Sequence, residues 1–302
     1  MSLISGLYIA LSLFTVYYLV VFIRGIKDVQ SRGEDLKPSL LGIATGAVTN
    51  FFDTLGIGSY ATTTTIFRST KQVRDEKIPG TLNVGHTLPT VVEAAVYVSL
   101  FRTAVDPTTL VEMIAAAVAG AWLGAGTFSR WPRRKIQIGM GLALLGFVGI
   151  MFYRTVYGDP TGGALLKLSG TFLIIGLVGN FILGILMTIG IGLYAPCMIL
   201  VAMLGMNPAA AFPIMMGSCA FLMPVASRNF IKERSWDPKA SMGLWIGGIP
   251  GVLIAYYLVK QIPLYYLKWL VMAVVVYTAI SMLITARKEA QAPADLAPSP
   301  TH

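Results

Sequence analysis

Residues 46–67 read GAVTNFFDTLGIGSYATTTTIF. The stretch is mostly apolar, so it belongs at membrane depth, yet it contains an acid (Asp53), a Gly-Ile-Gly break at 56–58 and four consecutive threonines. A helix that only crosses lipid needs none of these. Residues 190–195 repeat the core of the pattern as Gly-Ile-Gly-Leu-Tyr-Ala, against Gly-Ile-Gly-Ser-Tyr-Ala at 56–61. An interrupted apolar segment that recurs in both halves of a chain indicates a transporter's binding site.

The composition places the chain in a membrane. Of its 302 residues, 55% are hydrophobic and only 12% are charged, whereas soluble domains carry about 25% charged residues. The net charge of +9 does not predict nucleic-acid binding, because the basic residues lie in short loops where they orient helices in the bilayer. Cys197 and Cys219 lie inside apolar segments and have neither disulfide nor metal spacing, so we expect them to pack.

The apolar runs predict two similar units of helices. Pro79 and Pro213 are separated by the same 134 positions as the two Gly-Ile-Gly elements, so this shift superposes the units. We expect an all-α polytopic fold with a first unit at 1–135, a second at 136–263, an additional span at 264–285 and a disordered tail at 286–302. The expected spans are 4–23, 39–67 (broken), 79–101 and 108–128, then 136–153, 166–204 (broken), 208–227 and 240–259.

Loop charge predicts that the units are inverted. The basic loops are 24–37, 68–77, 130–135, 228–239 and 287–288. All of them can be cytoplasmic only if 39–67 and 166–204 each return to the side from which they entered. Segment 39–67 is too short for two crossings and is expected to fold back, whereas 166–204 could be a re-entrant hairpin or two full crossings. The N-terminus would then lie outside and the C-terminus in the cytoplasm.

The two breaks are the candidate binding site. Non-helical backbone at membrane depth must be buried in protein or line a wet cavity, and the helix that resumes presents free N–H groups suited to an anion. Glycine packing between helices is the alternative, and it is our interpretation of the patterns Gly120–Gly124 and Gly243–Gly247. The predicted substrate-binding residues are Asn50, Gly56, Gly58, Ser59, Tyr60, Thr62, Thr63, Asn83, His86, Gly190, Gly192 and Tyr194.

Asp53 and Glu93 are the candidate proton carriers. A carboxylate at mid-bilayer costs roughly 2.5–3.5 kcal/mol on insertion scales, so such a residue usually faces a cavity and acts. The alternative is a buried acid that is hydrogen-bonded for packing. His86 could share one helix face with Asn83 and Glu93 and contact an anion or relay protons, although a satisfied core histidine is the more frequent outcome.

No catalytic, metal or cofactor site is expected. The chain shows no nucleotide-binding loop, zinc-protease motif or nucleophile elbow. This argues against an ATP-driven pump and against a membrane hydrolase. A membrane-embedded enzyme or assembly factor is therefore the last of our hypotheses.

The two glycine-rich segments, Gly46–Phe67 and Asn180–Val201, each followed by a helix and a Pro-led span, resemble the sulfite exporter TauE/SafE family (TSUP permeases). The resemblance covers roughly residues 5–285. It implies a bacterial inner-membrane carrier for small sulfur-containing or organic anions such as sulfite or sulfoacetate. It also implies secondary transport, because the family lacks ATPase domains.

In place of the Gly-Gly-Gly continuation and the Val-Pro that the family often has, this chain carries Ser59–Thr65, preceded by Asp53. The resemblance implies an anion exporter that works by alternating access, with proton coupling through Asp53 as an option and a passive anion channel of the same fold as the alternative. The expected partners are the anion, the lipid bilayer and, as an open option, a second copy in a homodimer.

Overall fold

The computed structural model describes residues 2–100, 103–127, 163–188, 192–259 and 264–291, with 138–139, 141–142, 145–146, 148–149, 152–153 and 156 between them. Helices form the described part, and an isolated bridge joins Leu165 to Met206. The elements are α1 (Leu3–Ser31), α2 (Leu40–Thr54), α3 (Ser59–Thr70), η1 (Asp75–Lys77), α4 (Ile78–Leu100), α5 (Pro107–Thr127), α7 (Gly170–Thr188), α8 (Tyr194–Met203), η2 (Pro208–Ala210), α9 (Ala211–Lys232), α10 (Pro238–Val259) and α11 (Leu264–Gln291).

The fold is that of a polytopic helical membrane protein, as predicted. Within the described residues, five helical segments are long and apolar enough to cross a bilayer. Large apolar side chains face outward on several of them, with Leu13, Trp122 and Ile174 each more than half exposed. An outer surface this apolar suits lipid rather than water. The five segments are Leu3–Ser31, Pro107–Gly124, Gly170–Thr188, Pro208–Lys232 and Pro238–Leu258.

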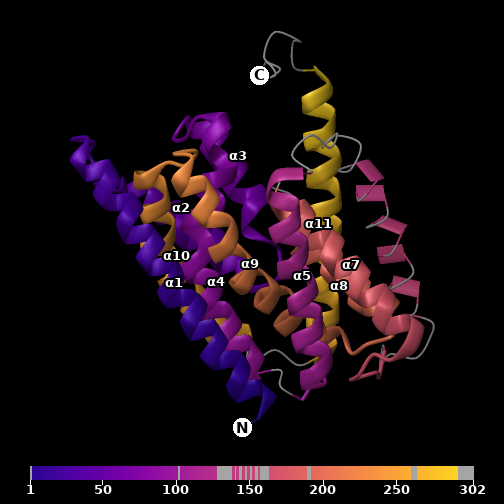
Figure 1. The fold of residues 1–302 in the computed structure, drawn as a ribbon. Helices are drawn as coiled ribbons and strands as arrows, with labels where there is room; N and C mark the ends of the chain where they lie inside the picture. Colours follow the sequence, from indigo (N-terminus) through magenta and orange to yellow (C-terminus); the bar gives the residue numbers. More distant parts are fainter. Residues whose placement is uncertain are drawn as a thin grey trace.

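The repeat is visible in the order of the elements. The shift of 134 residues carries α2, α3, η1, α4 and α5 onto α7, α8, η2, α9 and α10, with boundaries that differ by at most four residues. The equivalent helices α4 and α9 run antiparallel at the centre of the molecule (Figure 1). Tyr97 stacks on Phe212, whereas Thr87 contacts Ser227, so partner numbers fall along α9 as they rise along α4. Equivalent helices that point in opposite directions make the repeats inverted.

Each repeat contains one interrupted segment. At 1.5 Å per residue, α3 is about 18 Å long and α8 about 15 Å, less than the ~30 Å hydrocarbon core. Neither helix can complete a crossing. The length of α8 favours a re-entrant hairpin over two full crossings for 166–204, although α7 alone is long enough to span.

The broken helix of each repeat packs against the last helix of the other repeat. α2 lies along α10, and α5 lies along α7. A Cβ on Gly247 would collide with the carbonyl oxygen of Ile43, and one on Gly120 would collide with that of Phe181. The two small-residue patterns therefore serve close helix packing, as expected.

The predicted ends of α1 and α11 differ from the structure. α1 continues to Ser31, well past residue 23, because the charged link that follows its apolar part stays helical. α11 continues to Gln291, so residues 286–291 are helical and not part of a disordered tail. α4 forms where a span was expected at 79–101, but its buried polar residues keep it out of the five most apolar segments. Those residues are Thr81, Asn83, His86, Thr87, Thr90 and Glu93.

Candidate functional site

The first break is a tight, capped turn between α2 and α3. Gly56 and Gly58 have φ of +92° and +85°, a conformation that side-chain-bearing residues rarely adopt. Asp53 Oδ1 accepts a hydrogen bond from the Ser59 N–H at 2.7 Å, so the acid caps the start of α3. The Tyr97 hydroxyl donates to the Thr54 carbonyl at 2.9 Å, at the end of α2. Both new helix ends therefore have partners from the first repeat.

The second break begins a helix without a side-chain cap. α8 starts at Tyr194, and Leu193 at its N-cap has no side-chain acceptor to offer. Gly192, the equivalent of Gly58, does not adopt a positive φ. Gly190, which we predicted to bind substrate, lies outside the described residues. The first turn of α8 presents the N–H groups of Tyr194 and Ala195, because Pro196 has none.

A cavity of about 20 Å³, lined mostly by buried residues, lies between the two breaks. That volume holds about one water molecule. An anion larger than water therefore requires α3 and α8 to move apart. The lining residues come from both repeats and are Asp53, Gly58, Ser59, Tyr60, Thr90, Met187, Gly192, Leu193, Tyr194, Cys219 and Met223.

Glu93 connects the repeats beside this cavity. Its Oε1 accepts from the Thr54 hydroxyl at 2.9 Å, and its Oε2 accepts from the Tyr194 hydroxyl at 2.8 Å. Asp53 and Glu93 are 2% and 0% exposed. In the part of the chain that the structure describes, neither pairs with a lysine or an arginine. Two buried acids without a countercharge are typical of groups that exchange protons.

Tyr60 brings an unused hydroxyl to the cavity. Its side chain is 4% exposed and lines the cavity wall, yet its hydroxyl has no hydrogen-bond partner among the described residues. A buried hydroxyl without a partner is costly, so it indicates a group that is satisfied by a ligand or water. The equivalent residue of the second repeat, Tyr194, donates its hydroxyl hydrogen bond to Glu93.

His86 belongs to a separate polar cluster next to the cavity. Its Nδ1 lies 3.0 Å from Asn50 Oδ1, and its Nε2 lies 3.0 Å from Thr63 Oγ1. Asn50 Nδ2 donates to the Gly46 carbonyl, so Asn50 Oδ1 is the acceptor and His86 Nδ1 carries the proton. Thr63 can then donate to Nε2 of the neutral ring. The cluster links α2, α3 and α4, and it leaves no ring nitrogen free.

The cavity contains only part of the predicted set. The Thr62 hydroxyl donates a hydrogen bond to the Ser59 carbonyl, and the Asn83 side-chain amide donates one to the Pro79 carbonyl. Neither lines the cavity, and the same holds for Asn50, Gly56, Thr63 and His86. Sequence reasoning missed five lining residues that carry no charge and no break signal: Thr90, Met187, Leu193, Cys219 and Met223.

Cys219 and Met187 show why these residues were missed. We expected Cys219 to pack in the apolar core, and it does, with its thiol 3.3 Å from the Met187 sulfur. The same packing places both side chains in the cavity wall. Thr90 alone gave a usable signal, because it lies one helical turn before Glu93.

The chain matches the sequence family described as Sulfite exporter TauE/SafE over residues 2–152 and 172–301. The chain belongs to the sulfite exporter TauE/SafE family. No curated protein and no solved structure matches it. The family match confirms the resemblance seen in the two glycine-rich segments. With the apolar helices, it makes this TauE/SafE chain a multi-pass membrane protein of a family of exporters, not of enzymes.

Proposed function

We propose that this TauE/SafE protein is a secondary transporter that exports a small sulfur-containing or organic anion, such as sulfite or sulfoacetate, by alternating access. The observation that carries the proposal is the cavity whose wall is shared by both interrupted segments. A site at the interface of two inverted repeats can be opened to either side by moving one repeat against the other. The cavity has room for about one water molecule, so the structure shows a state that does not yet hold the anion.

The anion would bind where amide groups and a hydroxyl meet. The uncapped start of α8 and the unpartnered Tyr60 hydroxyl both border the cavity. Helix N-termini favour negative charge. With no lysine or arginine among the described lining residues, recognition would depend on these neutral donors. Sulfite and sulfonates present several acceptor oxygens to such donors.

Asp53 would couple the anion to a proton. Its carboxylate holds the Ser59 N–H, which is the amide that an anion at α3 would use. An ionised Asp53 and a bound anion therefore compete for one donor and repel each other. A proton on Asp53 removes the repulsion and frees the amide, so the proton and the anion would cross together and export would be driven by the anion's own outward gradient. Glu93 would act next, because its bond to Tyr194 must break when α8 moves away from α4.

The orientation in the bilayer is part of the proposal. The division into units at 1–135 and 136–263, the N-terminus outside and the C-terminus in the cytoplasm of a bacterial inner membrane follow from loop charge. α1 begins at the bottom of Figure 1, and α11 ends at its top.

Counterflow in liposomes tests the function. We expect uptake of labelled sulfite to saturate, and unlabelled sulfite trapped inside to accelerate it, because a carrier must reorient once per anion. A passive channel of the same fold would show neither effect. Taurine and a simple carboxylate in the same assay would delimit the substrate class. Absence of flux for every anion in the panel would contradict the proposal.

A further inference from the structure

A second pocket, which shares no lining residue with the cavity, lies where α1 ends and α9 ends. The two helices touch at Gly25, where a Cβ would lie 2.7 Å from Ile231 Cγ2. Around this contact the two helix ends line a surface pocket of about 370 Å³. Its lining residues are Val21, Arg24, Gly25, Asp28, Arg228, Ile231, Lys232 and Arg234.

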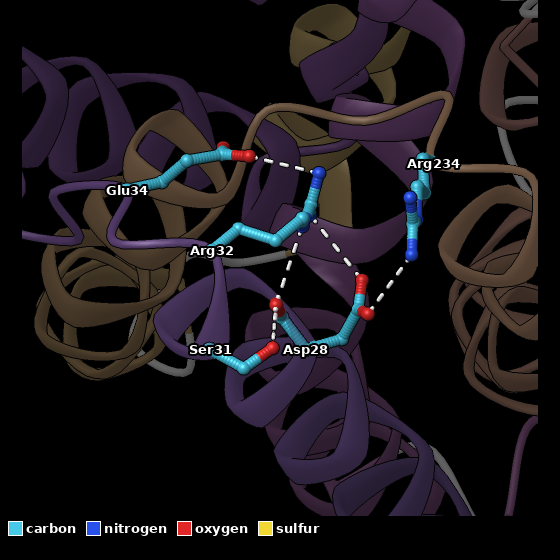
Figure 2. Close-up of polar contacts among 5 residues, drawn as sticks. All are labelled: Asp28, Ser31, Arg32, Glu34 and Arg234. Atoms are coloured by element: carbon cyan, nitrogen blue, oxygen red, sulfur yellow. Dashed lines mark hydrogen bonds and ion pairs between the residues drawn. The ribbon is translucent and has the colours of Figure 1, made fainter.

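The pocket has an excess of positive charge. Its single acid, Asp28, is already engaged, because it contacts Arg234 at 3.0 Å and Arg32 at 3.3 Å (Figure 2). Arg32 is held in turn by Glu34 at 2.8 Å. Arg24, Arg228 and Lys232 contact no acid within the described residues. Three like charges on one pocket repel one another unless an anion lies between them.

The pocket also has an apolar side. Val21 and Ile231 belong to its wall. On α1, Val20 and Ile23 are 42% and 49% exposed, at the height where the apolar part of the helix gives way to charge. Side chains of this kind face acyl chains, whereas the basic groups above them lie at headgroup level. A ligand that fills the pocket must therefore combine an anionic head with an apolar tail.

We propose that this pocket binds the phosphate-bearing headgroup of an anionic phospholipid. Arg24, Arg228 and Lys232 hold the phosphate, and the acyl chains run along the exposed apolar side of α1. The Asp28–Arg32–Glu34 chain of ion pairs in Figure 2 fixes Arg234 at the rim and keeps Asp28 from neutralising the other cations. Basic pockets between helices at the membrane surface recognise lipid heads in this way. The bound lipid would join α1 to α9, the central helix of the second repeat.

Lipid binding to the purified full chain tests this site. Phosphatidylglycerol and phosphatidylcholine with identical acyl chains are titrated into protein in neutral detergent, and bound lipid is counted by native mass spectrometry. The test variant is Arg24→Gln/Arg228→Gln. The control, Lys27→Gln/Lys37→Gln, removes the same charge from exposed positions outside the pocket lining. The thermal unfolding temperature of each variant in detergent shows that it is folded.

We expect one phosphatidylglycerol to bind in preference to phosphatidylcholine. The test variant should bind it roughly 30-fold more weakly, because each cation at an anionic membrane surface contributes a factor of roughly 5. The control should bind as the parent does. Equal loss in both variants would overturn the site in favour of general charge attraction. Displacement of the lipid by inorganic phosphate, with phosphate protecting the parent alone, would overturn the lipid in favour of a free-phosphate site.

Discussion

Asp53 occupies the amide end of α3 in the way that a bound anion would. We predict that Asp53→Asn leaves the fold intact, because asparagine caps helices about as well as aspartate and still accepts from the Ser59 N–H. It should abolish the pH gradient's effect on sulfite accumulation while leaving counterflow. The control is Asp106→Asn, since Asp106 caps α5 outside the cavity. Undiminished gradient-driven accumulation in Asp53→Asn would remove Asp53 from proton coupling.

Gly58 and Gly192 are equivalent by position but not by conformation. A Cβ at either would meet no atom within 4 Å, yet only Gly58 has a positive φ. We predict that Gly58→Ala lowers the free energy of unfolding by about 1–3 kcal/mol, the cost of a strained backbone. Gly192→Ala should change it by no more than about 0.5 kcal/mol. Chemical denaturation in detergent measures both free energies of unfolding. Equal effects would show that backbone strain does not explain the need for glycine at position 58.

Single residues also mark the limit of sequence reasoning about the site. The acids and glycines of the breaks could be predicted, because charge and interruption are expensive in lipid. Which hydroxyls remain available could not, because Thr63 and Tyr194 are used by partners that only the folded chain brings near. Tyr60 and Tyr194 occupy the same position after their Gly-Ile-Gly breaks, and yet Tyr60 is the one of the two without a partner among the described residues.

The close packing of α10 on α2 holds the two repeats together. A Cβ on Gly247 would meet the backbone of Ile43, which cannot move aside as a flexible side chain can. We predict that Gly247→Ala lowers the free energy of unfolding by about 1–3 kcal/mol, as overpacking does. Gly146→Ala is the control, because nothing lies within 4 Å of its Cβ. Thermal unfolding in detergent compares them, and a harmless Gly247→Ala would mean that the helices can separate freely.

The segment before α2 is tied to the start of α10 by an ion pair. Lys239 Nζ lies 2.7 Å from Asp35, and its hydrogen bond lowers the pKa of that carboxyl, with help from the Lys37 N–H. The folded pKa is thus below the unfolded value of about 3.9. The pair therefore stabilises the fold above that value and stops doing so as the pH falls through the folded pKa.

We accordingly predict that Lys239→Gln is less stable than the parent at neutral pH and that the difference vanishes in acid. Lys27→Gln, an exposed charge outside this pair, should show no such pH dependence. Unfolding measured from neutral pH to below pH ~3.9 tests both. A difference that persists in acid would assign the effect of Lys239 to packing rather than to Asp35.

Helices could be predicted from the sequence where a glycine, a proline or a charged loop interrupts the apolar pattern. The interrupted segments, the two Pro-led spans and the packing glycines all leave local marks. The ends of α1 and α11 were predicted too early, because charged residues there still favour helix and no proline interrupts either helix before Ser31 or Gln291. The antiparallel contact of α4 with α9 leaves no mark in either helix, and only loop charge hinted at it.

The inverted arrangement of the whole molecule fixes which loops share a side of the membrane. Because α2 and α3 return to the side they leave, residues 31 and 69 should lie on one side and residue 103 on the other. Ser31→Cys, Ser69→Cys and Thr103→Cys test this in intact cells with a membrane-impermeant maleimide. All three positions are exposed, and the chain's two native cysteines are buried, so background labelling is low.

We expect Thr103→Cys to react at once and the other two only after permeabilisation. Labelling of Ser31→Cys and Ser69→Cys on opposite sides would mean that residues 40–70 cross the bilayer completely. The repeats would then not be inverted, and the alternating-access proposal would lose its structural basis.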